Sequence, residues 1–283
     1  MQKMRNILRL NRRLQVGSIL ILIFLIFGLV LPRFSPYNAI DWNVVPRNLP
    51  ASKVHIFGTT SLGQDTFWLL TFAIQNSLFI GVIVAFFSTA IGVLAGLTAG
   101  YAGGVVDRVL ALLMDVFISV PSLPILILVA SLLQGKTSLL TIGIALIVFN
   151  WPWPARQVRA IALSMREREF INTARFSGKG TLGIVVYEIF PYIFNWSVAN
   201  FVNTVLVAIS TESALAVIGL SSVQQATLGT MIYWALQYQG ILGKKWYWIG
   251  SPVVAIVILF IALFLASTGF AEYSAEKRGR QSA

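Results

Sequence analysis

The stretch Arg166-Glu-Arg-Glu-Phe-Ile-Asn-Thr-Ala-Arg-Phe-Ser-Gly-Lys-Gly-Thr-Leu-Gly183 is a charged island between two long hydrophobic runs. Its first half, as far as Ala174, can form a helix, whereas Gly178, Gly180 and Gly183 then interrupt the pattern. Glycine inside a helix costs ~1 kcal/mol relative to alanine. The charged island, residues 166–183, is therefore predicted to be a short helix followed by a turn.

The charge pattern of the island is compatible with two interpretations. In one, the island is a solvated loop whose arginines hold it on the cytoplasmic side of a membrane. In the other, Phe170, Ile171 and Ala174 lie near one helix face and insert into a groove on a soluble partner.

Composition places the chain in the membrane. Its 283 residues are 57% hydrophobic and 11% charged, and the mean hydropathy is +0.80. One globular core cannot bury so much apolar surface, so we expect an all-α membrane protein. The chain has no cysteine and one histidine, His55, which excludes disulfides, thiolate nucleophiles and multi-histidine metal sites. His55 itself is interpreted as an ordinary loop histidine.

The hydrophobic runs and their breaks predict six transmembrane helices with both termini in the cytoplasm. Fifteen Lys and Arg residues fall on the predicted inner side and six on the outer side, as the positive-inside rule requires. The net charge of +11 thus reflects membrane orientation, and no nucleic-acid partner is expected. The predicted segments are a cytoplasmic N-terminal segment (1–13), a first span (14–32), an external loop (33–72), a core with five spans (73–271) and a cytoplasmic tail (272–283). Within the core, the spans are placed at about 73–101, 107–133, 138–155, 184–219 and 246–271.

Three residues within these spans are candidates for buried or gating positions. The Asp115 carboxylate lies in or near a span, where a charged group costs free energy unless it is paired or hydrated. Pro121 removes a backbone donor and promotes a kink. Glu212 is deeper and is expected to face the protein interior or a cavity. The second span also carries Gly81, Gly92, Gly96 and Gly100, which suit close helix packing.

Once these features are in place, the chain resembles the permease subunits of bacterial and archaeal ABC importers. Their coupling motif reads Glu-Ala-Ala, three residues, then Gly, and the matching positions here are Asn172-Thr-Ala174 and Gly178. Phe57-Gly-Thr-Thr-Ser-Leu-Gly-Gln-Asp65, Ala99-Gly-Tyr-Ala-Gly-Gly-Val-Val-Asp107 and Thr211-Glu-Ser-Ala-Leu215 narrow the similarity to the second permease of the dipeptide, oligopeptide and nickel group. The chain departs from the family pattern in having Asn172 and Thr173 for the usual Glu and Ala, and in lacking a C-terminal Asp-Pro-Arg.

The resemblance implies a type I importer permease fold with a cytoplasmic coupling helix near residues 166–182, in the plasma (inner) membrane. It implies four kinds of partner: a second, homologous permease forming a heterodimer, two ATP-binding subunits, an extracellular solute-binding protein and the lipid membrane. The residues carried over to the ATPase contact are Phe170, Ile171, Asn172, Thr173, Ala174, Gly178 and Leu182.

The chain is expected to be a transport subunit that binds no cofactor and has no enzymatic activity of its own. ATP and Mg are expected to bind to the partner ATPase subunits, which hydrolyse the ATP. Ser177-Gly-Lys-Gly-Thr181 does not have the Gly-x-x-x-x-Gly-Lys-Ser/Thr spacing of an ATP-binding loop. The expected cargo is an oligopeptide, and oligosaccharides and nickel stay open. A passive channel or ion-coupled carrier would instead use Asp115 and Glu212 as permeation or proton sites. An intramembrane enzyme is disfavoured because the sequence has no metal constellation or nucleophile-base pair.

Overall fold

The computed structural model describes residues 11–38, 40–133, 138–240 and 242–281, with side chains as far as residue 273. Most of the predicted N-terminal segment, the outer turn at 134–136 and the basic side chains of the tail lie outside this part. Regular structure in the described residues is helical, as predicted, and one isolated β-bridge joins Thr59 to Asp65. The helices are α2 (Arg12–Leu25), η1 (Ile26–Val30), η2 (Leu31–Phe34), α3 (Thr66–Ala102), α4 (Gly104–Ser119), α5 (Ser122–Leu132), α6 (Leu139–Asn150), α7 (Pro152–Arg166), α8 (Glu169–Phe176), α9 (Thr181–Ile184), η3 (Val185–Ile189), α10 (Phe190–Val217), α11 (Leu228–Gln237) and α12 (Trp246–Gln281).

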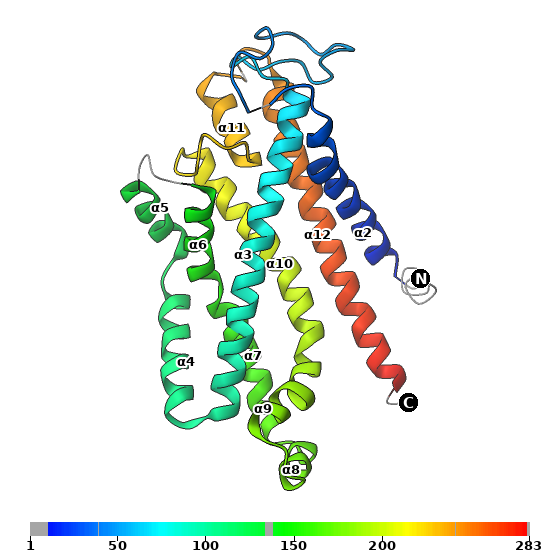
Figure 1. Cartoon of the computed structure of the whole chain (residues 1–283), viewed down its shortest axis with the longest axis vertical. Coiled ribbons are helices and arrows are strands. Elements are labelled where there is room, and N and C mark those ends of the chain that lie inside the picture. Colours follow the sequence, from blue (N-terminus) through cyan, green and yellow to red (C-terminus); the bar gives the residue numbers. More distant parts are fainter. Residues whose placement is uncertain (1–10, 39, 134–137, 241, 282–283) are drawn as a thin grey trace.

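The helices form an elongated bundle around α3. Figure 1 shows α3 running along the length of the molecule, with α2 and α12 side by side on one flank and α4 and α6 on the other. The short helix α8 lies at one end of the bundle, and α11 lies with the loop that precedes α3 at the opposite end. The start of α2 and the end of α12 are tied together by a hydrogen bond from Asn11 to Glu272 (2.8 Å) and by the Arg13–Glu272 ion pair.

Helix α3 begins earlier than the sequence pattern predicted. Asp65 is its N-cap: one carboxylate oxygen accepts hydrogen bonds from the backbone N–H groups of Phe67 (2.9 Å) and Trp68 (3.3 Å). Aspartate is a preferred N-cap because it satisfies donors that have no partner in the first helical turn. Residues 66–72, which the sequence analysis assigned to the external loop, are therefore helical.

The third predicted span is sharply bent. Helices α4 and α5 meet at an angle of 81°, and Val120 and Pro121 between them have extended backbone. Proline disfavours helical geometry in the residue before it. The kink predicted from Pro121 is therefore confirmed, as a complete break in the helix.

The fourth predicted span is also interrupted. It covers α6, a 12-residue helix, and the first turn of α7, which begins with Pro152 after Trp151. A helix of that length extends about 18 Å, whereas the hydrocarbon core of a bilayer is about 30 Å thick. Within the described residues, four helices are long and apolar enough to cross a membrane, and the bent pair α4–α5 raises that number to five.

Glycines allow α3 to pack closely against α7, as predicted. A Cβ atom on Gly92 would lie 2.6 Å from the Pro154 ring, and one on Gly96 would lie 2.4 Å from the Ala155 carbonyl oxygen. A Cβ atom on Gly100 would lie 2.6 Å from Ala162. Small residues at four-residue spacing let two helix backbones approach one another, so this stripe fixes α7 along α3.

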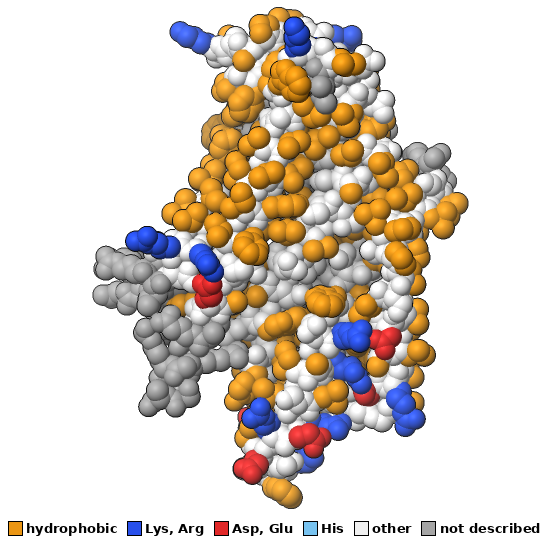
Figure 2. All heavy atoms as spheres, turned by 180° about the vertical axis from the view of Figure 1, so that it is seen from behind, with side chains coloured by type: hydrophobic (Ala, Val, Ile, Leu, Met, Phe, Trp, Pro, Cys, Tyr) orange, Lys and Arg blue, Asp and Glu red, His pale blue; other side chains and the backbone are white. Residues whose placement is uncertain are grey.

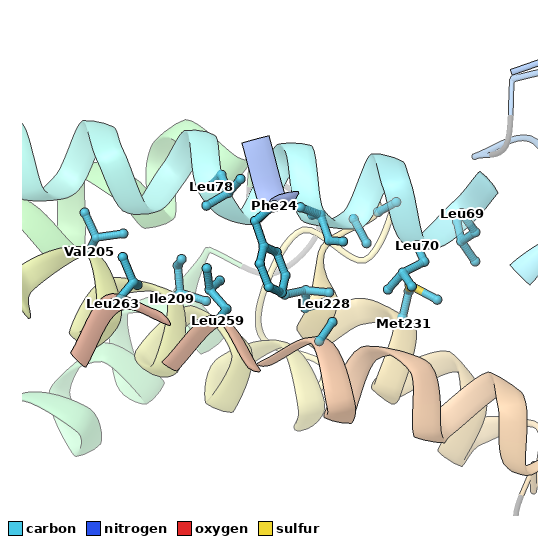
Figure 3. Packing of buried hydrophobic residues seen from close by; sticks show 14 of the residues in the cluster. Phe24, Leu69, Leu70, Leu78, Val205, Ile209, Leu228, Met231, Leu259 and Leu263 are labelled. Atoms are coloured by element: carbon cyan, nitrogen blue, oxygen red, sulfur yellow. The ribbon is translucent and has the colours of Figure 1, made fainter. Parts of the chain in front are cut away.

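The core and the surface agree with a membrane environment. Phe24 of α2, Leu78 of α3, Ile209 of α10 and Leu259 of α12 converge in the largest buried cluster (Figure 3). On the outside, hydrophobic side chains cover the long middle of the molecule, while charged side chains gather toward the α8 end (Figure 2). A surface of this kind suits a lipid solvent better than water.

Candidate functional site

The charged island forms the protruding end of the molecule. Helix α7 ends at Arg166, α8 covers Glu169–Phe176, and α9 begins at Thr181. The predicted short helix followed by a turn is thus observed. At the turn, Gly178 adopts a φ of +79°, which favours glycine. The backbone N–H of Lys179 donates to the Ala174 carbonyl (3.1 Å), which closes the helix end.

The apolar face of α8 points into this chain. Ile171 is fully buried and Ala174 is buried, in a cluster that also holds Ile184, Ile189 and Ile193. Phe170 is half-buried and stacks on Tyr192, with ring centroids 5.7 Å apart. These contacts anchor α8 to η3 and α10.

Burial therefore divides the residues predicted to contact an ATPase into two groups. Ile171 and Ala174 are unavailable to a partner in this structure, so the idea that they insert into a partner's groove does not fit their burial. Their spacing at i and i+3, with Phe170 beside them, is the ordinary signature of the inward face of an amphipathic helix. Phe170 is half-buried between these two groups, and the other four predicted contacts are exposed: Asn172, Thr173, Gly178 and Leu182.

Two large apolar side chains stand on the exposed side of the island. Phe176 is 92% exposed and Leu182 is 80% exposed. Sequence reasoning selected Leu182 and missed Phe176, although Phe176 is the last residue of α8 and directly precedes the glycine turn. We call these two side chains, together with Asn172, Thr173 and Gly178, the α8 tip.

Asp115 and Pro121 were expected to be buried or gating residues, and both are exposed in this chain. The Asp115 side chain is 59% exposed and pairs with Arg156 of α7 at 3.3 Å. Asp115 is thus paired and exposed to solvent, which is the condition that the sequence analysis set for a carboxylate in or near a span. A gating role for Asp115 or Pro121 stays a prediction.

A stronger ion pair, which sequence reasoning missed, links the same two helices. Arg159 of α7 donates two hydrogen bonds to Asp107 of α4, at 2.5 and 2.8 Å. Both side chains are mostly buried, and a bidentate Arg–carboxylate pair is geometrically specific. Together, the Arg159–Asp107 and Arg156–Asp115 pairs attach α4 to α7.

Glu212 is fully buried, as predicted. One of its carboxylate oxygens accepts hydrogen bonds from the hydroxyl groups of Ser221 (2.9 Å) and Thr227 (3.0 Å). Thr227 is also the N-cap of α11 and forms a capping box with Thr230. Glu212 therefore connects α10 to the segment that begins α11.

The loop before α3 is organised around a second buried carboxylate. Asp65 contacts His55 Nδ1 at 2.6 Å while it caps α3. Burial, and then the neighbouring Asp65 carboxylate, raises the pKa of Tyr37. His55 packs within the loop, as the sequence analysis interpreted it.

These features define a class of protein: an α-helical integral membrane protein whose charged island protrudes at one end of the bundle. More particularly, the chain belongs to the binding-protein-dependent transport system inner membrane component family, whose model matches residues 92–280.

Several relatives are permease proteins of peptide transport systems. The chain is 32% identical over 225 residues to the oligopeptide transport system permease protein OppC of Mycobacterium tuberculosis, covering 79% of this chain and 77% of the relative. It is 33% identical over 224 residues to the Bacillus subtilis protein of the same name, covering 79% of this chain and 73% of the relative. It is 31% identical over 213 residues to the dipeptide transport system permease protein DppC of Bacillus subtilis, covering 75% of this chain and 66% of the relative.

The fold also matches a solved structure. A chain of the MetNI methionine ABC transporter, in inward-facing conformations, superposes with a TM-score of 0.58 at 20% sequence identity. The match covers 74% of this chain and 96% of the other. The helical bundle described here is therefore a fold that an ABC transporter uses.

Proposed function

We propose that this chain is the permease subunit of an ATP-driven ABC importer and forms half of the translocation pathway for oligopeptides. The observation that carries the proposal is the family match over residues 92–280, together with relatives that are named as oligopeptide and dipeptide permeases. The cargo follows from those relatives. The chain's only histidine is engaged by Asp65, which gives nickel handling by this chain little support.

In this proposal the membrane core 73–271 contains five spans in addition to the first, with both termini in the cytoplasm. A total of six spans requires the fourth predicted span, α6 and the start of α7, to cross the membrane as one unit despite the interruption at Trp151. The α8 tip then lies in the cytoplasm, on the side where the sequence places most Lys and Arg residues.

The α8 tip is the proposed contact with one of two separate ATP-binding subunits, which hold ATP and Mg. Exposed apolar side chains at the centre of a contact supply most of its binding energy, and Phe176 and Leu182 fill that role here. Because α7 is fixed along α3 and α8 is anchored to α10, movement of the tip is transmitted to both long helices. Closure of the ATPase would thereby shift the permease between inward-open and outward-open arrangements.

The remaining partners are a second, homologous permease, which completes the pathway, and an external solute-binding protein, which delivers cargo. Asp115 is exposed and paired, and Glu212 holds two hydroxyl groups. Asp115 therefore gives no support to the passive channel or ion-coupled carrier considered from the sequence.

The proposal is tested by truncating the α8 tip. In the complex reconstituted with its partners, Phe176→Ala and Leu182→Ala should abolish most peptide uptake and peptide-stimulated ATP hydrolysis. Loss of a central apolar anchor costs about 2 kcal/mol, or roughly 30-fold in affinity for the ATP-binding subunit. Phe34→Ala and Leu242→Ala are matched controls, because these side chains are also highly exposed. Phe34 ends η2 and Leu242 lies between α11 and α12, and Figure 1 shows α11 and the loop before α3 at the end opposite α8. Uptake that proceeds without ATP, or equal effects in all four variants, would refute the proposal.

A further inference from the structure

A pocket opens at the end of the bundle opposite the α8 tip. It has a volume of about 470 Å³ and lies between residues 40–42 of the loop before α3, the start of α3, and residues 223–234. Volumes of roughly 300–1,000 Å³ are typical of small-molecule sites. The pocket is remote from the charged island, and the proposed coupling does not involve it.

One wall of the pocket carries an isolated negative charge. Asp41 is exposed at the pocket, and Asn38 Nδ2 donates to its Oδ1 at 3.1 Å. Between residues 33 and 65, and between 218 and 247, the sequence contains only two acidic residues, Asp41 and Asp65. Asp65 is buried and occupied with His55 and the α3 cap. At this end of the molecule, Asp41 is therefore the carboxylate available to an incoming cation.

The facing wall is aromatic. The rings of Trp42 and Trp234 meet edge to face, with centroids 5.5 Å apart and an interplanar angle of 83°. Trp234 Nε1 donates to the Val223 carbonyl at 3.0 Å, which fixes the orientation of its indole. Indole faces attract cations through the ring quadrupole, so the two tryptophans and Asp41 favour the same sign of charge.

The rest of the lining suits a short organic chain attached to that cation. Leu69 and Met231 supply apolar surface at the buried side, and Gln224 and Gln225 place amide groups at the exposed side. Side-chain amides donate and accept hydrogen bonds, as a peptide backbone requires. A neutral sugar could stack on the indoles, but it would leave the Asp41 carboxylate without a counter-charge.

We propose that this pocket binds the protonated amino terminus of a short peptide. The ammonium group lies between Asp41 and the indoles of Trp42 and Trp234, the first side chain packs toward Met231, and the following peptide bond contacts Gln224. This inference rests on the proposed function, because it assigns to that transport system a receiving position for cargo at the outer end of the permease.

The chain contains no cysteine, so Gln225→Cys gives this chain a single reporter thiol at the exposed side of the pocket and leaves the proposed contact of Gln224 in place. The test measures the rate at which a maleimide dye labels this variant in the reconstituted complex, with either Ala-Ala-Ala or its N-acetylated form present. We expect Ala-Ala-Ala to slow labelling several-fold and the acetylated peptide to leave the rate unchanged. Adding Asp41→Asn should remove the protection, whereas Glu167→Gln, at an exposed acid between α7 and α8, should preserve it.

Equal protection by the two peptides, or no protection by either, would overturn the inference. ATP-dependent uptake of Ala-Ala-Ala is measured in the same vesicles to separate this inference from the proposed function. Uptake without protection contradicts the pocket assignment and leaves the importer intact. Protection without uptake supports the pocket and contradicts the importer.

Discussion

The packing of α3 on α7 gives the most quantitative prediction, because it depends on space that only glycine leaves free. In Gly96→Ala, the new Cβ would lie 2.4 Å from the Ala155 carbonyl oxygen, 2.8 Å from Val158 Cβ and 2.9 Å from the Arg159 nitrogen. Two of these obstacles are backbone atoms, which cannot rotate away. The helices must separate, and the contacts of the neighbouring glycines with α7 are lost as well.

The expected cost follows from two opposing effects. Overpacking typically destabilises by 1–3 kcal/mol, and the three close contacts place this site near ~3 kcal/mol. Replacing glycine by alanine within a helix stabilises the helix by about 1 kcal/mol, because alanine has the higher helix propensity. The net destabilisation is therefore about 2 kcal/mol.

The matched control is Gly143→Ala in α6. A Cβ on Gly143 would meet its nearest neighbour at 3.8 Å, an ordinary contact distance, so this variant should be as stable as the parent protein or slightly more stable. The assay is reversible unfolding by SDS in mixed micelles, followed by tryptophan fluorescence. If Gly96→Ala and Gly143→Ala unfold at the same SDS fraction, the packing account of α7 is wrong.

Three further substitutions test the polar connections. Glu212→Ala leaves two buried hydroxyl groups without their acceptor and should lower the free energy of unfolding by about 1–3 kcal/mol. Backbone amides in the segment preceding α11 should then exchange hydrogen faster, and an unchanged exchange rate would contradict the connection between α10 and α11. Arg159→Lys retains the charge but loses the bidentate geometry with Asp107, so the free energy of unfolding in SDS should fall by about 1 kcal/mol. An unchanged unfolding midpoint would show that the charge alone holds α4 on α7. Asp65→Ala removes the N-cap of α3, which stabilises the protein by about 1 kcal/mol, and should make the preceding loop more susceptible to proteolysis. If the variant resists proteolysis as well as the parent protein, contacts other than those of Asp65 hold the loop in place.

Several features of the fold were predictable because they depend on local chemistry. Glycines at four-residue spacing identify the face of α3 that another helix approaches, and Pro121 identifies a break whatever the tertiary context. The buried state of Glu212 followed from its depth in an apolar run. In each case, a single residue type carries a strong backbone or solvation constraint.

The features that were missed depend on which neighbours a helix meets. Ile171 and Ala174 have the spacing of an amphipathic face, but the sequence does not show whether that face meets the same chain or a partner. Asp115 was expected to need pairing or hydration, but the sequence did not show that Arg156 of α7 would be its partner. Phe176 was not predicted as a contact, because the sequence does not show that a large apolar side chain at the end of α8 stays exposed.

The central claim is that the α8 tip touches an ATP-binding subunit, and crosslinking tests it most directly. The chain has no cysteine, so Ser177→Cys, at an exposed residue next to Phe176, carries one thiol at the tip and leaves both apolar anchors in place. Phe34→Cys carries one thiol at an exposed position of η2. With a short thiol-to-amine crosslinker in the assembled complex, Ser177→Cys should form an adduct with the ATP-binding subunit, with a yield that changes between nucleotide-free and ATP-bound states. Phe34→Cys should form none. Absence of that adduct from Ser177→Cys, or equal yields from both positions, would contradict the account.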